Sequence, residues 1–171
     1  MTFDPPKHNR QSLRWPGYDY HEPGAYYITV CCQHRFLLFG EIVDGVMRLN
    51  EFGRVVDEIW RGLPRHYQRL EVDQFVVMPN HLHGIVILSP EWTKAGLSPA
   101  PTPLSEVVRA LKSFSAREIN RLRNSPGVPV WQRNYYDHVM RDDEDLNRIR
   151  EYILDNPANW GKDENNPESW K

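Results

Sequence analysis

The chain has 171 residues, of which 40% are hydrophobic and 26% are charged, proportions typical of one globular domain that buries a real core. Its net charge of −2 and pI near 6.4 give no global support for nucleic-acid binding, so such a site would have to come from local clusters of basic residues. No apolar run reaches the roughly 18 residues of a membrane span, and the N-terminus lacks the apolar segment of a signal peptide. We therefore expect a single cytoplasmic domain, 1–171, with no membrane partner.

The first 22 residues are predicted to form a polar, proline-containing arm. Basic residues alternate there with aromatic ones, among them Arg10, Arg14, Trp15 and Tyr18. Such residues can grip phosphates and stack on unpaired bases. The alternative is that Trp15 and Tyr18 simply pack over a sheet edge, and the sequence favours neither interpretation.

The next segments predict strands. Residues 25–32 are rich in β-branched and aromatic residues, and residues 37–43 and 46–49 flank Asp44-Gly45 as the two strands of a hairpin. Alternation along the first strand sends Cys31 and Cys32 to opposite faces. They are therefore expected to be buried thiols of a reducing compartment and not a disulfide or zinc pair.

Two amphipathic helices are predicted to cover the sheet. Asn50 can cap the first, whose apolar residues recur at intervals of three and four until Pro64. A proline-rich loop over 89–103 precedes the second helix, which Thr102-Pro103 opens. The buried side of the second helix is predicted to hold Leu104, Val107, Val108, Leu111, Phe114 and Ile119.

The exposed side of the second helix is biased towards positive charge. That side carries five basic and two acidic residues, which gives a local net charge of +3 (five minus two): Arg109, Lys112, Arg117, Arg121 and Arg123 with Glu106 and Glu118. A charged face is usually only solvated, but this bias would suit a phosphate backbone. The residues predicted to contact DNA are Arg10, Arg14, Trp15, Tyr18, Lys112, Arg117, Arg121 and Arg133.

A His-x-His pair opens the second of two apolar strand segments, which Met78-Pro79-Asn80 separates. Residues two apart on a strand point to the same face, so His81 and His83 can hold a metal ion together. Taken alone, such a pair is more often structural, with one ring packed on a helix and the other at a hairpin.

The chain ends in a predicted strand, 130–140, a helix and a tail, 158–171. Acidic residues 142–145 suit the N-terminus of that helix, and Pro157 ends it. Tyr152 and Asn156 lie four apart and therefore on one face; the simplest reading makes Tyr152 a packing residue and Asn156 a C-terminal cap. The order of elements predicts an α+β fold, a ferredoxin-like antiparallel sheet covered by helices.

The histidine strand followed by a helix with a tyrosine resembles the HUH single-tyrosine transposases of bacterial insertion sequences. The chain is more similar still to their domesticated branch, the REP-associated tyrosine transposases, which act on repetitive extragenic palindromes. The similarity follows the order of the chain in five segments: 17–20, 39–43, 76–84, 135–139 and 152–157. It implies the HUH endonuclease-type fold over nearly the whole chain.

The resemblance also implies an activity. His81 and His83 would be metal ligands, Asn156 the third ligand and Tyr152 the nucleophile, with Mg²⁺ or Mn²⁺ as the cofactor. The expected enzyme nicks and rejoins single-stranded DNA at REP-like palindromic hairpins through a 5′-phosphotyrosine intermediate. The resemblance further implies a monomer or homodimer associated with the nucleoid.

Two other classes of function are compatible with the sequence. One is a catalytically retired protein that only binds DNA hairpins, and the other is an unrelated metal-dependent hydrolase without a covalent intermediate. Tyr135 and Tyr136 are rival nucleophiles, although neither has a metal-ligand partner four residues further on.

Overall fold

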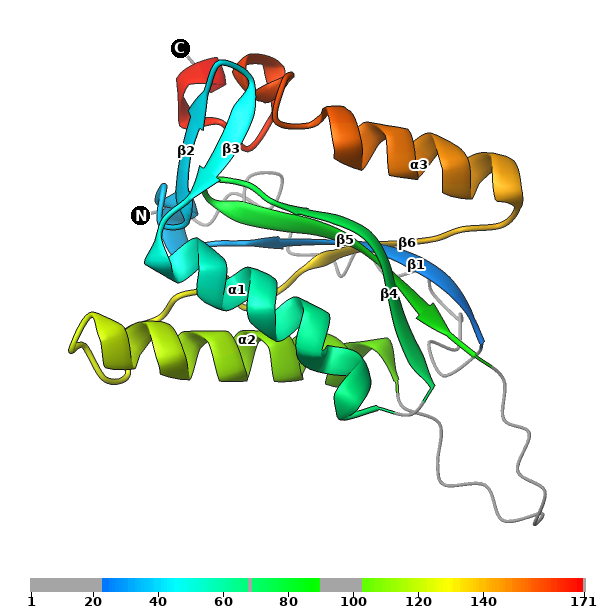
Figure 1. The fold of residues 1–171 in the computed structure, drawn as a ribbon, viewed down its shortest axis with the longest axis horizontal. Coiled ribbons are helices and arrows are strands. Elements are labelled where there is room, and N and C mark those ends of the chain that lie inside the picture. Colours follow the sequence, from blue (N-terminus) through cyan, green and yellow to red (C-terminus); the bar gives the residue numbers. More distant parts are fainter. Residues whose placement is uncertain (1–22, 68, 90–102, 171) are drawn as a thin grey trace, which may run out of the picture.

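The computed structural model describes residues 23–67, 69–89 and 103–170, which fold around one antiparallel sheet (Figure 1). The strand order is β4–β5–β1–β6. The strands are β1 (Gly24–Cys31), β4 (Leu70–Val77), β5 (His81–Leu88) and β6 (Tyr136–Val139), with a separate hairpin of β2 (Gly40–Val43) and β3 (Val46–Leu49). The helices are α1 (Glu51–Gly62), α2 (Leu104–Leu122) and α3 (Asp143–Asp155).

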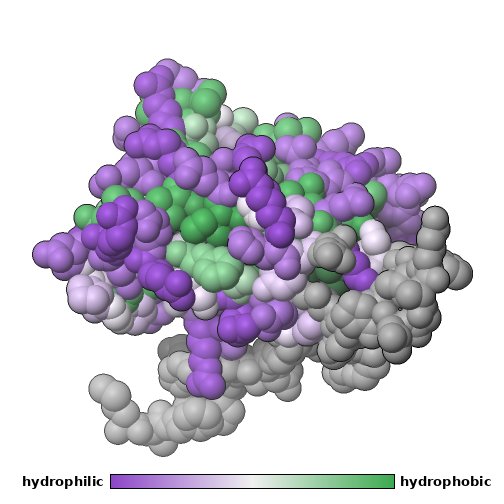
Figure 2. Space-filling view, turned by 60° about the horizontal axis from the view of Figure 1, so that its bottom comes forward, coloured by the Kyte–Doolittle hydropathy of each residue, from purple (hydrophilic) through white to green (hydrophobic). Residues whose placement is uncertain are grey.

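The helices cover both faces of the sheet. Helices α1 and α2 lie side by side on one face, and α3 crosses the other (Figure 1). The larger hydrophobic core fills the space between the sheet and the α1–α2 layer, while a smaller cluster that includes Tyr27, Ile85 and Ile153 packs beneath α3. Hydrophilic residues predominate on the outer surface on the α1–α2 side, with hydrophobic patches between them (Figure 2).

Side-chain alternation along β5 assigns its residues to the two cores. Leu82 and Val86 point into the larger core, whereas Ile85 belongs to the cluster beneath α3. His81 and His83 therefore face α3 as well. Gly84 faces the opposite side, where Trp60 of α1 packs so closely that a Cβ on Gly84 would lie 2.4 Å from its Cζ2 atom.

The prediction that the two cysteines point to opposite faces is confirmed, but only Cys32 is fully buried and Cys31 is half-buried. Cys32 is buried in the larger core, while Cys31 points to the other face, where its thiol donates to Asn165 Oδ1 at 3.6 Å. Both thiols are free.

The predicted helix starts are confirmed by their capping bonds. Asn50 Oδ1 accepts from the Gly53 amide at 3.0 Å, and Asp142 Oδ1 accepts from the Asp145 amide at 2.8 Å. The arm, 1–22, and most of the predicted loop, 90–102, lie outside the described residues. Within the described ranges, no helix combines the length and apolar character needed to cross a bilayer.

Two predicted strands are shorter than expected. The predicted first hairpin strand, 37–43, begins only at Gly40, because the Phe39 amide donates to the Pro79 carbonyl and not to the hairpin ladder. The predicted strand 130–140 is regular only over Tyr136–Val139. Before it, Trp131 forms a single bridge to Cys32, and Lys112 engages the carbonyls of residues 132–134, which takes them out of a ladder.

The prediction that Phe114 lies on the buried side of α2 is also wrong. Phe114 is 37% exposed, and its ring contacts that of His66, with centroids 5.7 Å apart.

The contact between Gly84 and Trp60 predicts a large difference between two glycine substitutions. Gly84→Ala should lower the free energy of unfolding by about 1–3 kcal/mol, the usual cost of overpacking a core. Gly62→Ala is the matched control, because nothing lies within 4 Å of its Cβ position; it should be neutral or stabilising by about 0.4–1 kcal/mol. Urea unfolding of both variants measures this, and equal stabilities would contradict the packing described here.

Candidate active site

The register of the sheet surrounds His83 with hydroxyl groups. Thr29 of β1 lies directly opposite His83, and Tyr27 lies diagonally beside it, positions from which side chains on one face can meet. His83 Nδ1 is 2.7 Å from Tyr27 Oη and 2.8 Å from Thr29 Oγ1, and the Thr29 hydroxyl donates to Tyr27 Oη at 3.1 Å. These contacts fix the orientation of the ring and leave Nε2 pointing away from the hydroxyl groups.

Asn80 fixes the tautomer of His81. The amide nitrogen of Asn80 donates to the carbonyls of Arg35 (3.1 Å) and Asn165 (2.8 Å). Its Oδ1 therefore faces His81 Nδ1, 2.8 Å away, and can only accept. The His81 proton is thus on Nδ1, and Nε2 carries a lone pair.

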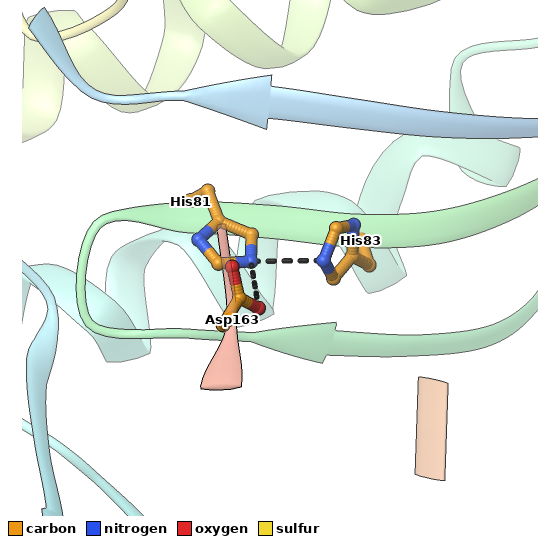
Figure 3. A group of neighbouring side chains, drawn as sticks. All are labelled: His81, His83 and Asp163. Carbon is orange, nitrogen blue, oxygen red and sulfur yellow. Dashed lines mark hydrogen bonds and ion pairs between the residues drawn. The ribbon is translucent and has the colours of Figure 1, made fainter. Parts of the chain in front are cut away.

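The two histidines point their Nε2 atoms at each other. These atoms are 2.9 Å apart (Figure 3), and both rings are almost completely buried. Burial lowers the pKa of His81 to about 3 and that of His83 well below its usual value. At neutral pH both rings are therefore uncharged, the state in which imidazole binds a metal ion.

Asp163 is the third group at this point, and it comes from the segment after α3. Its Oδ1 accepts from the Asn165 amide at 2.6 Å, which holds the carboxylate in place. Its Oδ2 lies 3.7 Å from His81 Nε2 (Figure 3) and is buried without a hydrogen-bond partner. Ligand atoms of His81, His83 and Asp163 all lie within 4.8 Å of one another.

Tyr152 and Asn156 lie at the C-terminal end of α3, and Tyr152 lies beside His83. Tyr152 is 45% exposed, and its ring meets the His83 ring edge-on, with centroids 5.5 Å apart. Asn156 is buried, and its Oδ1 has no hydrogen-bond partner. Tyr152, Asn156 and Asp163 line one cleft of about 470 Å³.

The environment keeps the Tyr152 phenol protonated at neutral pH. Burial, followed by the charge of Asp163, raises its pKa above the usual value, although hydrogen bonds with Asn156 and Tyr27 act in the opposite direction. Burial raises the pKa of Tyr27 further still.

An ion pair holds α3, the helix that carries Tyr152, on the sheet. The register of β4 and β5 shifts between Val72 and Phe75, and Asp73 in this irregular stretch binds the guanidinium group of Arg150 on α3. Arg150 lies two residues before Tyr152, so this contact helps to set the distance between the tyrosine and the histidines.

The residues predicted to bind DNA are placed differently from one another. Lys112 Nζ donates to the carbonyls of residues 132–134 at 3.0–3.1 Å, and burial lowers its pKa to about 8. Arg121 pairs with Glu118 on the helix surface, while Arg117 and Arg133 are exposed. Arg10, Arg14, Trp15 and Tyr18 lie outside the described residues. A DNA-binding role for all of these stays a prediction.

The buried donor set fits a divalent cation. Two neutral imidazole nitrogens face each other, and the Oδ2 of Asp163 and the Oδ1 of Asn156 are buried acceptors without a hydrogen bond. Mixed nitrogen and oxygen ligands suit Mn²⁺ and tolerate Mg²⁺. The sequence singled out His81 and His83 of the His81, His83 and Asp163 group but missed Asp163, because no local pattern distinguishes it from other acids in the C-terminal segment. A ligand role for Asn156 stays a prediction.

This arrangement of sheet, histidine pair and tyrosine helix is that of the HUH fold, and the chain belongs to the family of IS200-like transposases. The sequence model of that family matches residues 26–156. Membership makes the chain an HUH transposase, and it confirms the resemblance seen in the sequence.

Individual relatives agree with this assignment. An uncharacterized protein of Haemophilus influenzae is 36% identical over 167 residues, which span 92% of this chain and 93% of the relative. A second protein of that organism, provisionally named a REP-associated tyrosine transposase, is 26% identical over a region that spans 84% of this chain and 75% of the relative. The solved structure of a REP-associated tyrosine transposase bound to a REP hairpin superposes with a TM-score of 0.59 at 21% identity, covering 86% of this chain and 75% of that one.

The geometry predicts which substitutions weaken metal binding. His81→Ala should abolish Mn²⁺ binding measured by isothermal titration calorimetry. Asp163→Asn should weaken it at least about tenfold, since a negatively charged ligand is lost. Glu168→Gln is the matched control, because it removes the same charge from an exposed side chain of the same segment that does not line the cleft, and it should leave the affinity within about twofold.

Undiminished Mn²⁺ binding by His81→Ala would contradict this metal centre. Equal affinities of Asp163→Asn and Glu168→Gln would remove Asp163 from the ligand set. Thermal unfolding of the metal-free variants verifies that each is folded.

Proposed function

We propose that this chain is a metal-dependent endonuclease and strand transferase for single-stranded DNA, which acts through a covalent 5′-phosphotyrosine at Tyr152. The observation that carries the proposal is the position of the Tyr152 ring, edge-on to His83 in a cleft that Asn156 and Asp163 also line. A tyrosine in a merely structural role would not need to be half-exposed beside a buried, neutral histidine.

The proposed reaction exchanges one phosphate ester for another. Tyr152 Oη attacks the phosphorus of the scissile phosphate, and the bond between that phosphorus and the DNA 3′ oxygen breaks. The phenol proton passes to water, and the departing 3′ oxygen takes up a proton. The products are a 5′-phosphotyrosine and a free 3′-hydroxyl. Because the ester energy is conserved, a second 3′-hydroxyl can reverse the step and rejoin the strand.

A metal ion bound by His81 and His83, with oxygens from Asp163 and Asn156, would stabilise the charge that develops on the phosphate. Mg²⁺ is the proposed physiological ion because it is abundant, and Mn²⁺ should replace it. Tyr27, Thr29 and Asn80 contribute by holding the two imidazoles in the orientation described above, a function that ligand-orienting residues commonly have in metal sites.

The proposed substrate is a palindromic hairpin of REP-like sequence with an unpaired flank. In support, the structural relative named above is bound to a REP hairpin, and a hairpin offers a short duplex for shape recognition together with bases that are already unstacked. Arg10, Arg14, Trp15 and Tyr18 are proposed to contact the flank. Lys112, Arg117, Arg121 and Arg133 are proposed to follow the backbone. We also propose that the protein acts as a monomer or homodimer at the nucleoid.

A phenylalanine substitution tests the nucleophile directly. Tyr152→Phe removes only the hydroxyl group, so the protein should fold and bind a hairpin oligonucleotide, but the denaturant-stable protein–DNA adduct seen with the wild type should disappear. Tyr136→Phe is the matched control, because Tyr136 is similarly exposed, at 41%, and its ring also contacts Tyr27. Gel electrophoresis of 5′- and 3′-labelled substrates in Mn²⁺ detects the adduct.

The same assay separates the alternatives. An adduct formed by Tyr152→Phe but not by Tyr136→Phe would move the nucleophile to Tyr136. Hairpin binding without cleavage by the wild type would indicate a retired binding protein, and cleavage without an adduct would indicate a hydrolase. A fully paired duplex of the same sequence should not be cleaved, since opening it costs free energy at every base step.

A further inference from the structure

The turn after β1 carries an exposed apolar patch whose residues have no part in the chemistry above. Phe36 and Leu37 are 65% and 57% exposed, and the exposed His34 ring lies against Phe36, with centroids 5.6 Å apart. Single exposed apolar residues are common, but aromatic and aliphatic side chains that gather on one turn mark a surface for contact.

The backbone of this turn is strained. His34 and Arg35 both have a φ of 54°, in the left-handed region that residues other than glycine adopt only when their surroundings impose it. Two such residues in succession turn the chain sharply and lead it directly into Phe36 and Leu37.

Hydrogen bonds clamp this turn onto the residues that precede His81. They run from the Cys32 amide to the Asn80 carbonyl (2.8 Å), from the Phe39 amide to the Pro79 carbonyl (2.9 Å), and from Asn80 Nδ2 to the Arg35 carbonyl (3.1 Å). Asn80 is also the residue that binds His81 Nδ1. The position of the patch is therefore fixed relative to the metal centre.

Arg35, which precedes Phe36, connects the turn to the segment that carries Asp163. The Arg35 side chain donates to the Glu164 carbonyl at 3.0 Å, and Glu164 follows Asp163 in the chain. An aromatic surface, a guanidinium group and a cation site in succession match the chemistry of an unpaired nucleotide, which offers a flat base and an anionic phosphate.

We propose that His34, Phe36 and Leu37 form a stacking platform for one unpaired base beside the scissile phosphate. This inference rests on the proposed function, since it requires a single DNA strand in the cleft. Stacking on Phe36 would hold the strand so that the neighbouring phosphate lies at Tyr152, and every base can stack because each has a π-face.

The test separates contact with bases from contact with phosphates. Fluorescence anisotropy compares a labelled oligothymidine of about 15 nucleotides, a length near the upper end of known single-strand sites, with an abasic strand that carries the same phosphates. The wild type should prefer the oligothymidine. Phe36→Ala should bind it about 5- to 100-fold more weakly, while its affinity for the abasic strand should stay within about twofold.

Two further variants serve as controls. Phe36→Trp keeps a flat aromatic face and should retain the preference for bases. Val128→Ala removes an apolar side chain that is 45% exposed and lies in the loop after α2, and it should behave as the wild type. Mn²⁺ affinity should be the same in all of these proteins.

Each remaining outcome overturns a defined claim. If Phe36→Ala binds both strands as the wild type does, or loses affinity for both equally, the platform is wrong while single-strand binding stands. If the wild type binds neither strand nor a hairpin, the proposed function itself fails, and the patch must contact another partner.

Discussion

His81 can offer a lone pair to a metal ion only because its Nδ1 proton is donated to the side chain of Asn80. Asn80 in turn is held by two backbone carbonyls, one in the turn after β1 and one in the segment after α3. A single amide side chain therefore connects three parts of the chain that are distant in sequence, and it does so in a buried site where an unsatisfied polar atom is costly. The position of Asp163 and the position of the turn both depend on this connection.

The sheet and the tyrosine helix contribute differently to the site. Register fixes the histidines, because Thr29 and Tyr27 lie on the neighbouring strand at positions where their hydroxyl groups must meet the His83 ring. Tyr152 stands on a separate element, held by the small cluster beneath α3 and by the Asp73–Arg150 ion pair. The proposed nucleophile and the proposed metal ligands therefore come from different elements, and their distance depends on how α3 packs on the sheet.

Features that depend on local spacing could be predicted from the sequence. The shared face of His81 and His83 follows from the two-residue period of a strand, and the shared position of Tyr152 and Asn156 from the helical period. The cap at Asn50 follows from residue type, and the start of α3 from its run of acidic residues. The identity of the fold required the resemblance to a family, because the order of strands and helices alone is compatible with several sheets.

Features that depend on distant contacts could not be predicted. Asn80 looked like a mere interruption between strands, and Asp163 like one acid among several near the C-terminus, because their roles arise only when the last segment packs against β5. Lys112 was expected to face solvent, yet its ammonium group satisfies three backbone carbonyls that the shortened last strand leaves without a ladder. Such contacts join residues that are far apart in the chain, so local sequence patterns do not predict them.

The central claim is that two neutral histidines and an oxygen ligand define one metal position beside Tyr152. A crystal structure of the protein grown in Mn²⁺, with anomalous scattering recorded at the manganese edge, tests it most directly. The account predicts one strong anomalous peak within bonding distance of His81 Nε2, His83 Nε2 and an oxygen of Asp163 or Asn156. The absence of a peak there, with the histidines hydrogen-bonded to each other and manganese bound elsewhere, would contradict it.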